Sequence, residues 1–138
     1  MATTIRPTVS GKNKYWIDRH RYYELKHFCL QYPVWRDKYV SISELSSRPL
    51  DKEKLHISDI SDTTAKLALV RTKYRDLMDL VESTARETDQ ELASYIVKAV
   101  TEEYTYETLK FKFKIPCCRE VYYNLYRRFF WLLSEKRG

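Results

Sequence analysis

The stretch KFKIPCCREVYYNLYRRFFWLL, residues 112–133, places a proline and two adjacent cysteines ahead of a long run of aromatic and basic residues. A residue that precedes proline is pushed out of helical geometry, so a helix before this point must end ahead of Pro116. After the proline, good helix formers run from Arg119 towards Lys136 without a breaker, and Cys118 stands at the capping position. The stretch therefore predicts a turn followed by a long C-terminal helix.

The expected C-terminal helix has two distinct faces. Its apolar face is the expected contribution to the core: Cys118, Val121, Tyr122, Leu125, Phe129, Leu132 and Leu133. Its opposite face is polar: Arg119, Glu120, Tyr123, Asn124 and Arg127. Upstream, Thr105 can cap a short helix that ends before Pro116. A short helix, a turn and a longer helix with a separate polar face match the helix-turn-helix plan, in which the second helix lies in the major groove of DNA.

The polar face carries groups that recognise base edges. Arg119 and Arg127 can pair bidentately with guanine or grip a phosphate. Asn124 can pair with adenine, and Glu120 can accept a hydrogen bond from cytosine. The cations expected to meet the DNA backbone lie on the preceding helix and the turn: Lys110, Lys112 and Lys114. The alternative is a solvated helix face with no ligand.

The rest of the chain also reads as helical. Residues 1–14 are polar and unpatterned, which predicts a mobile tail. Asp18 can cap a helix that runs to Tyr32, and Pro33 suits the first turn of a second helix over Val34 to Leu45. A loop rich in Ser and Asp is expected over residues 46–62.

From Asp62 onward a heptad-like pattern predicts an amphipathic helix. Its seam, which suits packing in a bundle or a homodimer contact, consists of Leu67, Val70, Tyr74, Leu77 and Val81. Thr88 and Glu91 fit a capping box for a further helix over residues 89–103. The alternation of residues 109–115 leaves one edge strand as an alternative. The best account is an all-α fold with a C-terminal helix-turn-helix: a helical region over 15–104 and the helix-turn-helix unit over 105–138, together one compact domain.

The distribution of charge and the number of glycines limit the classes of function that can be expected. The chain carries a net charge of +6, and residues 105–138 hold eight Lys or Arg against three Asp or Glu. Such a basic segment favours a polyanionic partner, of which nucleic acid is the commonest. The only glycines are Gly11 and Gly138, so a phosphate-cradling P-loop or Rossmann turn is not expected. Lys114, Ile115 and Pro116 must make the turn without glycine.

Other classes of protein find little support. Three cysteines cannot form an even disulfide framework, which predicts a reducing, intracellular setting. Adjacent Cys117 and Cys118 lack C-x-x-C spacing, so no metal, redox site or cofactor is expected. The apolar run over 129–133 is far shorter than the ~20 residues of a membrane span. No nucleophile-base pair or carboxylate dyad is defensible, so we do not expect an enzyme or any catalytic residue.

Several segments together resemble a known family. They are the aromatic N-terminal helix ending in Tyr-Pro, the stretch SDTTAKLALVRTKY at residues 61–74, and TYETLKFKFKIPCCREVYYNLYRRFFWLLSEKR at residues 105–137. These are similar to the ArpU/RinA-like transcriptional regulators of bacteriophages and prophages in Firmicutes. The resemblance implies a helix-turn-helix like region 4 of sigma factors and control of phage late genes. It places the recognition-helix start at Arg119 to Asn124 and the cap at Cys118, where the family usually has serine.

The same resemblance implies double-stranded DNA as partner, host RNA polymerase as a second one, and the cytoplasm of the bacterial host cell as location. Two alternatives stay open. The first is a phage interaction protein that binds a host protein or assembly through the heptad seam and through Tyr15, Trp16, Tyr22, Tyr23 and Trp35. The second is a small terminase subunit with oligomerising helices.

Overall fold

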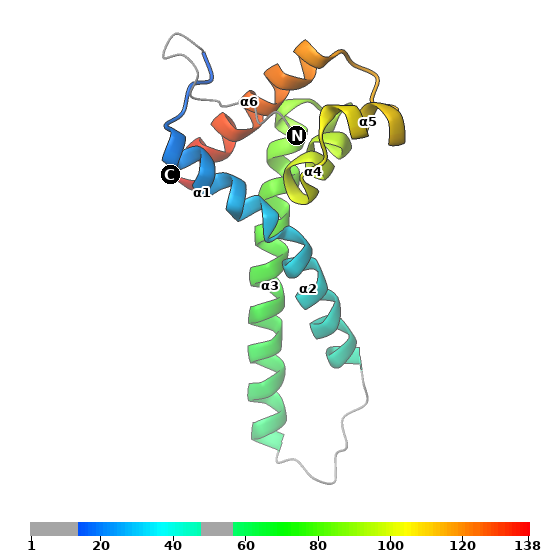
Figure 1. The fold of residues 1–138 in the computed structure, drawn as a ribbon. Helices are drawn as coiled ribbons and strands as arrows, with labels where there is room; N and C mark the ends of the chain where they lie inside the picture. The colour runs from blue at the N-terminus through cyan, green and yellow to red at the C-terminus, as the bar shows by residue number, and fades with distance from the viewer. Residues whose placement is uncertain (1–13, 48–56) are drawn as a thin grey trace. The chain divides into compact units, whose positions relative to one another are not determined.

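The structure is a computed structural model and describes residues 14–47 and 57–138. Over these ranges the regular secondary structure is entirely helical, which confirms the all-α class (Figure 1). The helices are α1 (Arg19–Leu30), α2 (Tyr32–Ser47), α3 (Ile57–Thr88), α4 (Ala93–Glu102), α5 (Tyr106–Lys112) and α6 (Arg119–Arg137). Apart from Lys14, the predicted N-terminal tail lies outside the described residues.

The described chain divides into two compact units. The first combines the residues up to Gln31 with Leu80–Gly138, and the second is formed within Tyr32–Asp79. In the first unit α6 packs on α1 and α4, and α4 also contacts α1 and α5. The segment over 105–138 is therefore not packed on itself alone but against helices from both ends of the chain.

The first two helices form for the reasons the sequence suggested. Asp18 caps α1, because its carboxylate accepts a hydrogen bond from the His20 amide at 3.0 Å. One face of α1 is buried: Tyr22, Leu25, Phe28 and Cys29. Pro33 lies in the first turn of α2, where its missing amide hydrogen costs nothing. The predicted helix over residues 34–45 is confirmed, with two further residues at each end.

Two predictions about α3 are wrong. The helix already begins at Ile57, so the expected loop over 46–62 cannot include residues 57–62, while residues 48–56 lie outside the described part. The capping box is also incorrect, because buried Thr88 still belongs to α3 and donates to the Thr84 carbonyl at 2.8 Å. Asp89 instead orders the turn ahead of α4, since its carboxylate accepts from the amides of Glu91 and Leu92, both at 3.0 Å, whereas Leu92 at the N-cap of α4 forms no side-chain capping bond. Burial of the Thr84 and Thr88 face carries α3 past the expected boundary.

The turn between α5 and α6 is made without glycine. Thr105 caps α5 as predicted, with its hydroxyl accepting from the Thr108 amide at 3.2 Å, and helix α5 rules out the edge strand. Lys114 takes the left-handed conformation with φ of 56°, a position that usually favours glycine. This allows the Ile115 amide to donate to the Leu109 carbonyl at 3.1 Å and puts the Ile115 side chain in the core.

The core of the first unit contains a cluster of aromatic rings. Phe130 is fully buried and meets the rings of Tyr22, Tyr126 and Phe129 at centroid distances of 5.1, 4.9 and 5.1 Å. The hydroxyls of Tyr22 and Tyr126 bond each other at 2.7 Å, so these tyrosines bring no unpaired polar atom into the core.

The expected apolar face of α6 is only partly buried. The core contains Tyr122, Phe129 and Leu133, as predicted. It also contains Phe130, which was not assigned to the apolar face in the sequence analysis. Leu125 and Leu132 are half-buried, whereas Val121 and Cys118 are exposed, so their assignment to the core is wrong. The physical reason is that the buried side of α6 is set by its contacts with α1 and α4. Those contacts leave the outer side of its first turn uncovered.

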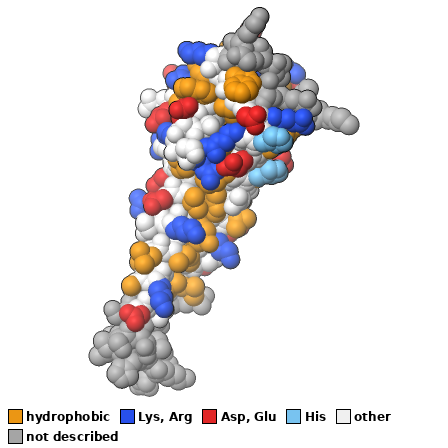
Figure 2. Space-filling view, turned by 90° about the vertical axis from the view of Figure 1, so that its left-hand side faces the viewer, with side chains coloured by type: hydrophobic (Ala, Val, Ile, Leu, Met, Phe, Trp, Pro, Cys, Tyr) orange, Lys and Arg blue, Asp and Glu red, His pale blue; other side chains and the backbone are white. Residues whose placement is uncertain are grey.

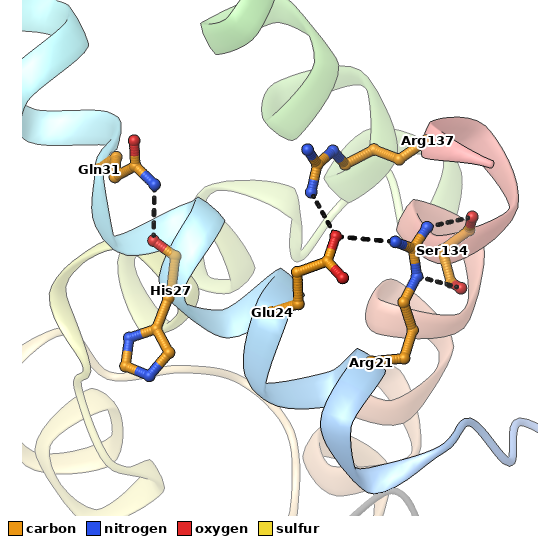
Figure 3. Close-up of polar contacts among 6 residues, drawn as sticks. All are labelled: Arg21, Glu24, His27, Gln31, Ser134 and Arg137. Carbon is orange, nitrogen blue, oxygen red and sulfur yellow. Dashed lines mark hydrogen bonds and ion pairs between the residues drawn. The ribbon is translucent and has the colours of Figure 1, made fainter.

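A polar network ties the end of α6 to α1 (Figure 3). Arg21 donates to the side chain and the carbonyl of Ser134, both at 3.1 Å, and pairs with Glu24 at 2.9 Å. Arg137 reaches the same carboxylate at 3.4 Å and lies 3.9 Å above the Phe28 ring. The helix C-terminus is therefore held by cations that also complement its dipole.

Because two tyrosines are buried, the free energy of unfolding is expected to depend on pH in the alkaline range. Burial raises the pKa of Tyr22 from 10.0 to about 12, and burial also raises the pKa of Tyr126. The unfolded chain loses these protons near pH 10 while the folded chain keeps them, so the free energy of unfolding should fall from about pH 10 to 12. Each group contributes about 1.4 kcal/mol per pH unit in that window.

Urea unfolding between about pH 8 and 11.5, followed by helical circular dichroism, measures this loss, because it records the free energy of unfolding at each pH. The variant Tyr22→Phe/Tyr126→Phe removes both groups and should show a shallower decline. An equally steep decline in that variant would place the cause elsewhere, for instance in surface lysines.

The second unit exposes much of its apolar surface. Within it Arg71 of α3 bonds the Tyr39 hydroxyl of α2 at 3.3 Å and lies 5.2 Å above its ring. Figure 2 shows apolar side chains at the molecular surface. The large exposed apolar residues of this unit are Val34, Val40, Leu45, Leu69 and Val70. The predicted seam does not form one exposed stripe, since Leu67, Tyr74 and Leu77 are half-buried and Val81 is fully buried. A homodimer through this seam stays a prediction.

Candidate nucleic-acid interface

The residues predicted to contact DNA lie on α5, on the turn and on the first half of α6. Six of them are exposed: Lys110, Lys112, Lys114, Arg119, Glu120 and Asn124. Tyr123 and Arg127 are half-buried. The turn at Lys114 to Pro116 brings the two helices together, so these side chains belong to one region of the first unit.

Arg119, the first residue of α6, is held by two partners on α5. Its guanidinium forms an ion pair with the Glu107 carboxylate and lies 5.5 Å above the Tyr106 ring. Tyr106 is itself fixed, because its hydroxyl donates to the Cys117 carbonyl at 2.7 Å and its ring packs 5.6 Å from that of Tyr122. The Arg119 side chain nevertheless keeps 53% of its surface exposed. Arginine is thus both oriented and accessible at the start of the helix.

Glu107 is well placed to stay ionised. The pKa of its carboxyl is lowered by a hydrogen bond from the backbone amide at the start of α5, and the neighbouring Arg119 guanidinium adds to this. A carboxylate in the first turn also suits the positive end of the helix dipole. The Glu107 carboxyl is therefore ionised throughout the neutral pH range.

Further along α6, Arg127 donates to the Asn124 side-chain oxygen at 3.2 Å. The two residues are three positions apart and share one face of the helix. Because Asn124 accepts from Arg127 with its oxygen, its amide nitrogen stays available as a donor. The Tyr123 ring packs 5.3 Å from Tyr122, so only part of its surface is accessible.

The lysines of α5 differ in their surroundings. Lys112 lies 5.7 Å from the Tyr104 ring and 5.5 Å from the Phe113 ring, and Lys98 lies 5.0 Å over the same Phe113. These cation–π contacts place positive charge beside aromatic rings without neutralising it. Lys110 and Lys114 are exposed. All of these lysines can therefore meet an anionic partner.

The sequence missed some features and misjudged others. Phe111 is 84% exposed between Lys110 and Lys112, and it was not singled out in the sequence analysis. Conversely, Tyr22 and Trp35, expected as exposed anchors for a protein partner, are buried, and only Trp16 of that set is exposed. The pairing of Arg119 with Glu107 carries no local sequence signal, because the residues are twelve positions apart.

The adjacent cysteines lie directly ahead of α6, and both are free thiols. Cys118 occupies the capping position of α6 but makes no side-chain hydrogen bond there. Burial raises the pKa of Cys117. In the part of the chain that the structure describes, no three His, Cys, Asp or Glu side chains gather in a way that suits a metal ion. Over the same residues none of the helices is both long and apolar enough to cross a membrane.

Comparisons with protein families, with curated proteins and with solved structures found no match for this chain. The similarity to phage regulators therefore stays a prediction from the quoted residues. Any assignment of function depends on the chemistry of the surface formed by α5, the turn and α6.

Proposed function

We propose that this chain is a sequence-specific DNA-binding transcriptional regulator of phage or prophage late genes, which binds double-stranded DNA through α5, the turn and α6. The observation that carries the proposal is the exposed polar start of α6, led by the oriented Arg119, beside exposed lysines on α5 and the turn. Recognition helices contact base edges with their N-terminal residues, and neighbouring cations hold the backbone.

In this proposal each group has a defined role. Arg119 and Arg127 pair with guanine or phosphate, Asn124 pairs with adenine, and Glu120 accepts from cytosine. Tyr123, which is half-buried, lies beside them on α6. The backbone cations are Lys110, Lys112 and Lys114. The link to late genes, the bacterial cytoplasm and host RNA polymerase derives from the resemblance of residues 105–137 to ArpU/RinA-like regulators.

Salt dependence tests the backbone contacts. If three lysines each neutralise a phosphate, the variant Lys110→Gln/Lys112→Gln/Lys114→Gln should lower the slope of log affinity against log salt by about 2.7, at roughly 0.9 per contact. Fluorescence anisotropy with labelled duplex DNA from about 50 to 200 mM salt measures it.

A matched variant removes the same charge elsewhere. Lys38→Gln/Lys66→Gln/Lys73→Gln takes three exposed lysines from α2 and α3, in the second unit. We expect its salt slope to stay close to that of the wild type. Equal slopes for all three proteins would show that the α5 lysines do not contact phosphate, and the absence of any salt-dependent binding would refute the DNA proposal.

A protein partner is the second candidate, because Phe111 is 84% exposed and Val121 43% exposed beside the same region. Large exposed aromatic side chains are frequent anchors of protein interfaces. A pull-down from host extract with wild type and with Phe111→Ser separates the two functions. A partner that is lost on this change, in a protein that binds no duplex, would favour the interaction function.

A further inference from the structure

We infer that Glu107 is a specificity-determining positioning residue, which holds Arg119 so that it contacts guanine rather than phosphate. This inference rests on the proposed DNA-binding function and names one base that the surface reads. It starts from the ion pair between the Glu107 carboxylate and Nη2 of Arg119, which joins α5 to α6 across the turn.

The first step is preorganisation. The guanidinium is confined by the Glu107 carboxylate and by the Tyr106 ring at 5.5 Å. The position of Tyr106 is fixed, because its hydroxyl donates a hydrogen bond to the Cys117 carbonyl and its ring packs on buried Tyr122. A side chain that is ordered before binding loses less rotamer entropy when DNA arrives.

The second step concerns the donors left free. Arginine offers five N–H groups in a rigid fork, and the contact with Glu107 uses Nη2. Nη2 carries two N–H groups, so one remains, and together with the parallel N–H of Nη1 or of Nε it can meet the O6 and N7 acceptors of guanine. More than half of the Arg119 side-chain surface is exposed, so a base edge can reach it.

The third step is charge. Glu107 neutralises Arg119 locally, and its own carboxylate repels a phosphate that approaches the pair. An uncharged acceptor edge meets no such repulsion. The arrangement therefore weakens the attraction of Arg119 for any DNA backbone while it preserves hydrogen bonding to a base. Among the residues that the structure describes, Arg127 pairs with no carboxylate and contacts Asn124 instead, so it is the better phosphate ligand of the two.

The test uses the variant Glu107→Gln, which keeps the size of the side chain and removes its charge. A preferred site is first selected from random duplex DNA with the wild type. Affinities are then measured for that site and for versions in which each guanine is changed to adenine. We expect Glu107→Gln to bind unrelated duplexes more tightly, and its discrimination at one guanine to fall roughly tenfold, within the range of one bidentate arginine contact.

Two further proteins make the result specific. Arg119→Lys keeps the charge but not the fork, so it should lose discrimination at the same guanine, and adding Glu107→Gln to it should change that discrimination no further. Thermal melts should stay similar, because the pair is exposed. If Glu107→Gln keeps full discrimination, or loses affinity equally for all duplexes, the positioning role is refuted while DNA binding stands. If the wild type selects no sequence at all, the proposed function itself fails.

Discussion

Replacing Phe130 by alanine is expected to lower the free energy of unfolding by about 3–5 kcal/mol, the usual cost of emptying a buried phenylalanine site. Phe130 has no exposed surface and touches Tyr22, Tyr126 and Phe129 through three ring contacts between 4.9 and 5.1 Å. The cavity would also loosen the packing around the bonded hydroxyls of Tyr22 and Tyr126. Because a domain is stable by only about 5–15 kcal/mol, this single change removes a large share.

The chain offers a matched control for the same chemical change. Phe111→Ala deletes an identical side chain from a site that is 84% exposed, so the expected loss is within about 0.5 kcal/mol. Urea unfolding of both variants, followed by helical circular dichroism, compares them directly. Similar losses in the two variants would mean that the aromatic core does not hold the first unit together.

Local signals in the sequence were enough to find most helices. Pro116 set the end of α5, Thr105 supplied its cap, and the breaker-free run fixed α6. These features act within a few residues, where steric exclusion and capping decide the backbone. Such local sequence features were sufficient to predict the all-α class.

The same reasoning failed where tertiary packing decides. Thr88 looked like a cap because it precedes Glu91 by three, but it is buried and belongs to α3, and α4 begins only at Ala93 without a side-chain cap. A helical wheel gives the spacing of apolar residues and not which neighbours will cover them. It therefore placed exposed Val121 in the core and omitted buried Phe130.

In the candidate site, too, local features could be predicted from the sequence and tertiary contacts could not. Its polar residues were predicted from spacing along one helix, and the structure leaves most of them exposed. The orientation of Arg119 depends on its ion pair with Glu107, which lies twelve residues away across a turn. The hydrogen bond between Arg21 and Ser134 joins residues that are 113 positions apart. Such pairings follow from the assembled fold, so no local pattern predicts them.

Changing Arg119 and Arg127 together to alanine is expected to weaken binding to the preferred duplex by about 100-fold or more. A bidentate arginine–guanine contact discriminates by roughly 1–3 kcal/mol, and loss of a phosphate contact adds to this. Arg119 is exposed and Arg127 only half-buried, and both pair with exposed residues, so the melt should change little. Loss of binding with an unchanged melt would assign these residues to the ligand.

The control removes two arginines from the second unit. Arg36→Ala/Arg75→Ala has the same change in charge, and both side chains are exposed, with Arg75 in a weak 3.9 Å pair with Asp79. Competition measurements at one fixed salt concentration compare the proteins on specific and unrelated duplexes. If the control loses as much affinity as the α6 variant, the effect is net charge alone. If the α6 variant unfolds, Arg119 and Arg127 are needed for folding, and their proposed role in contacting bases is not supported. Selective loss on the preferred duplex is the result that only base contacts at α6 explain, because a uniform change in charge weakens all duplexes alike.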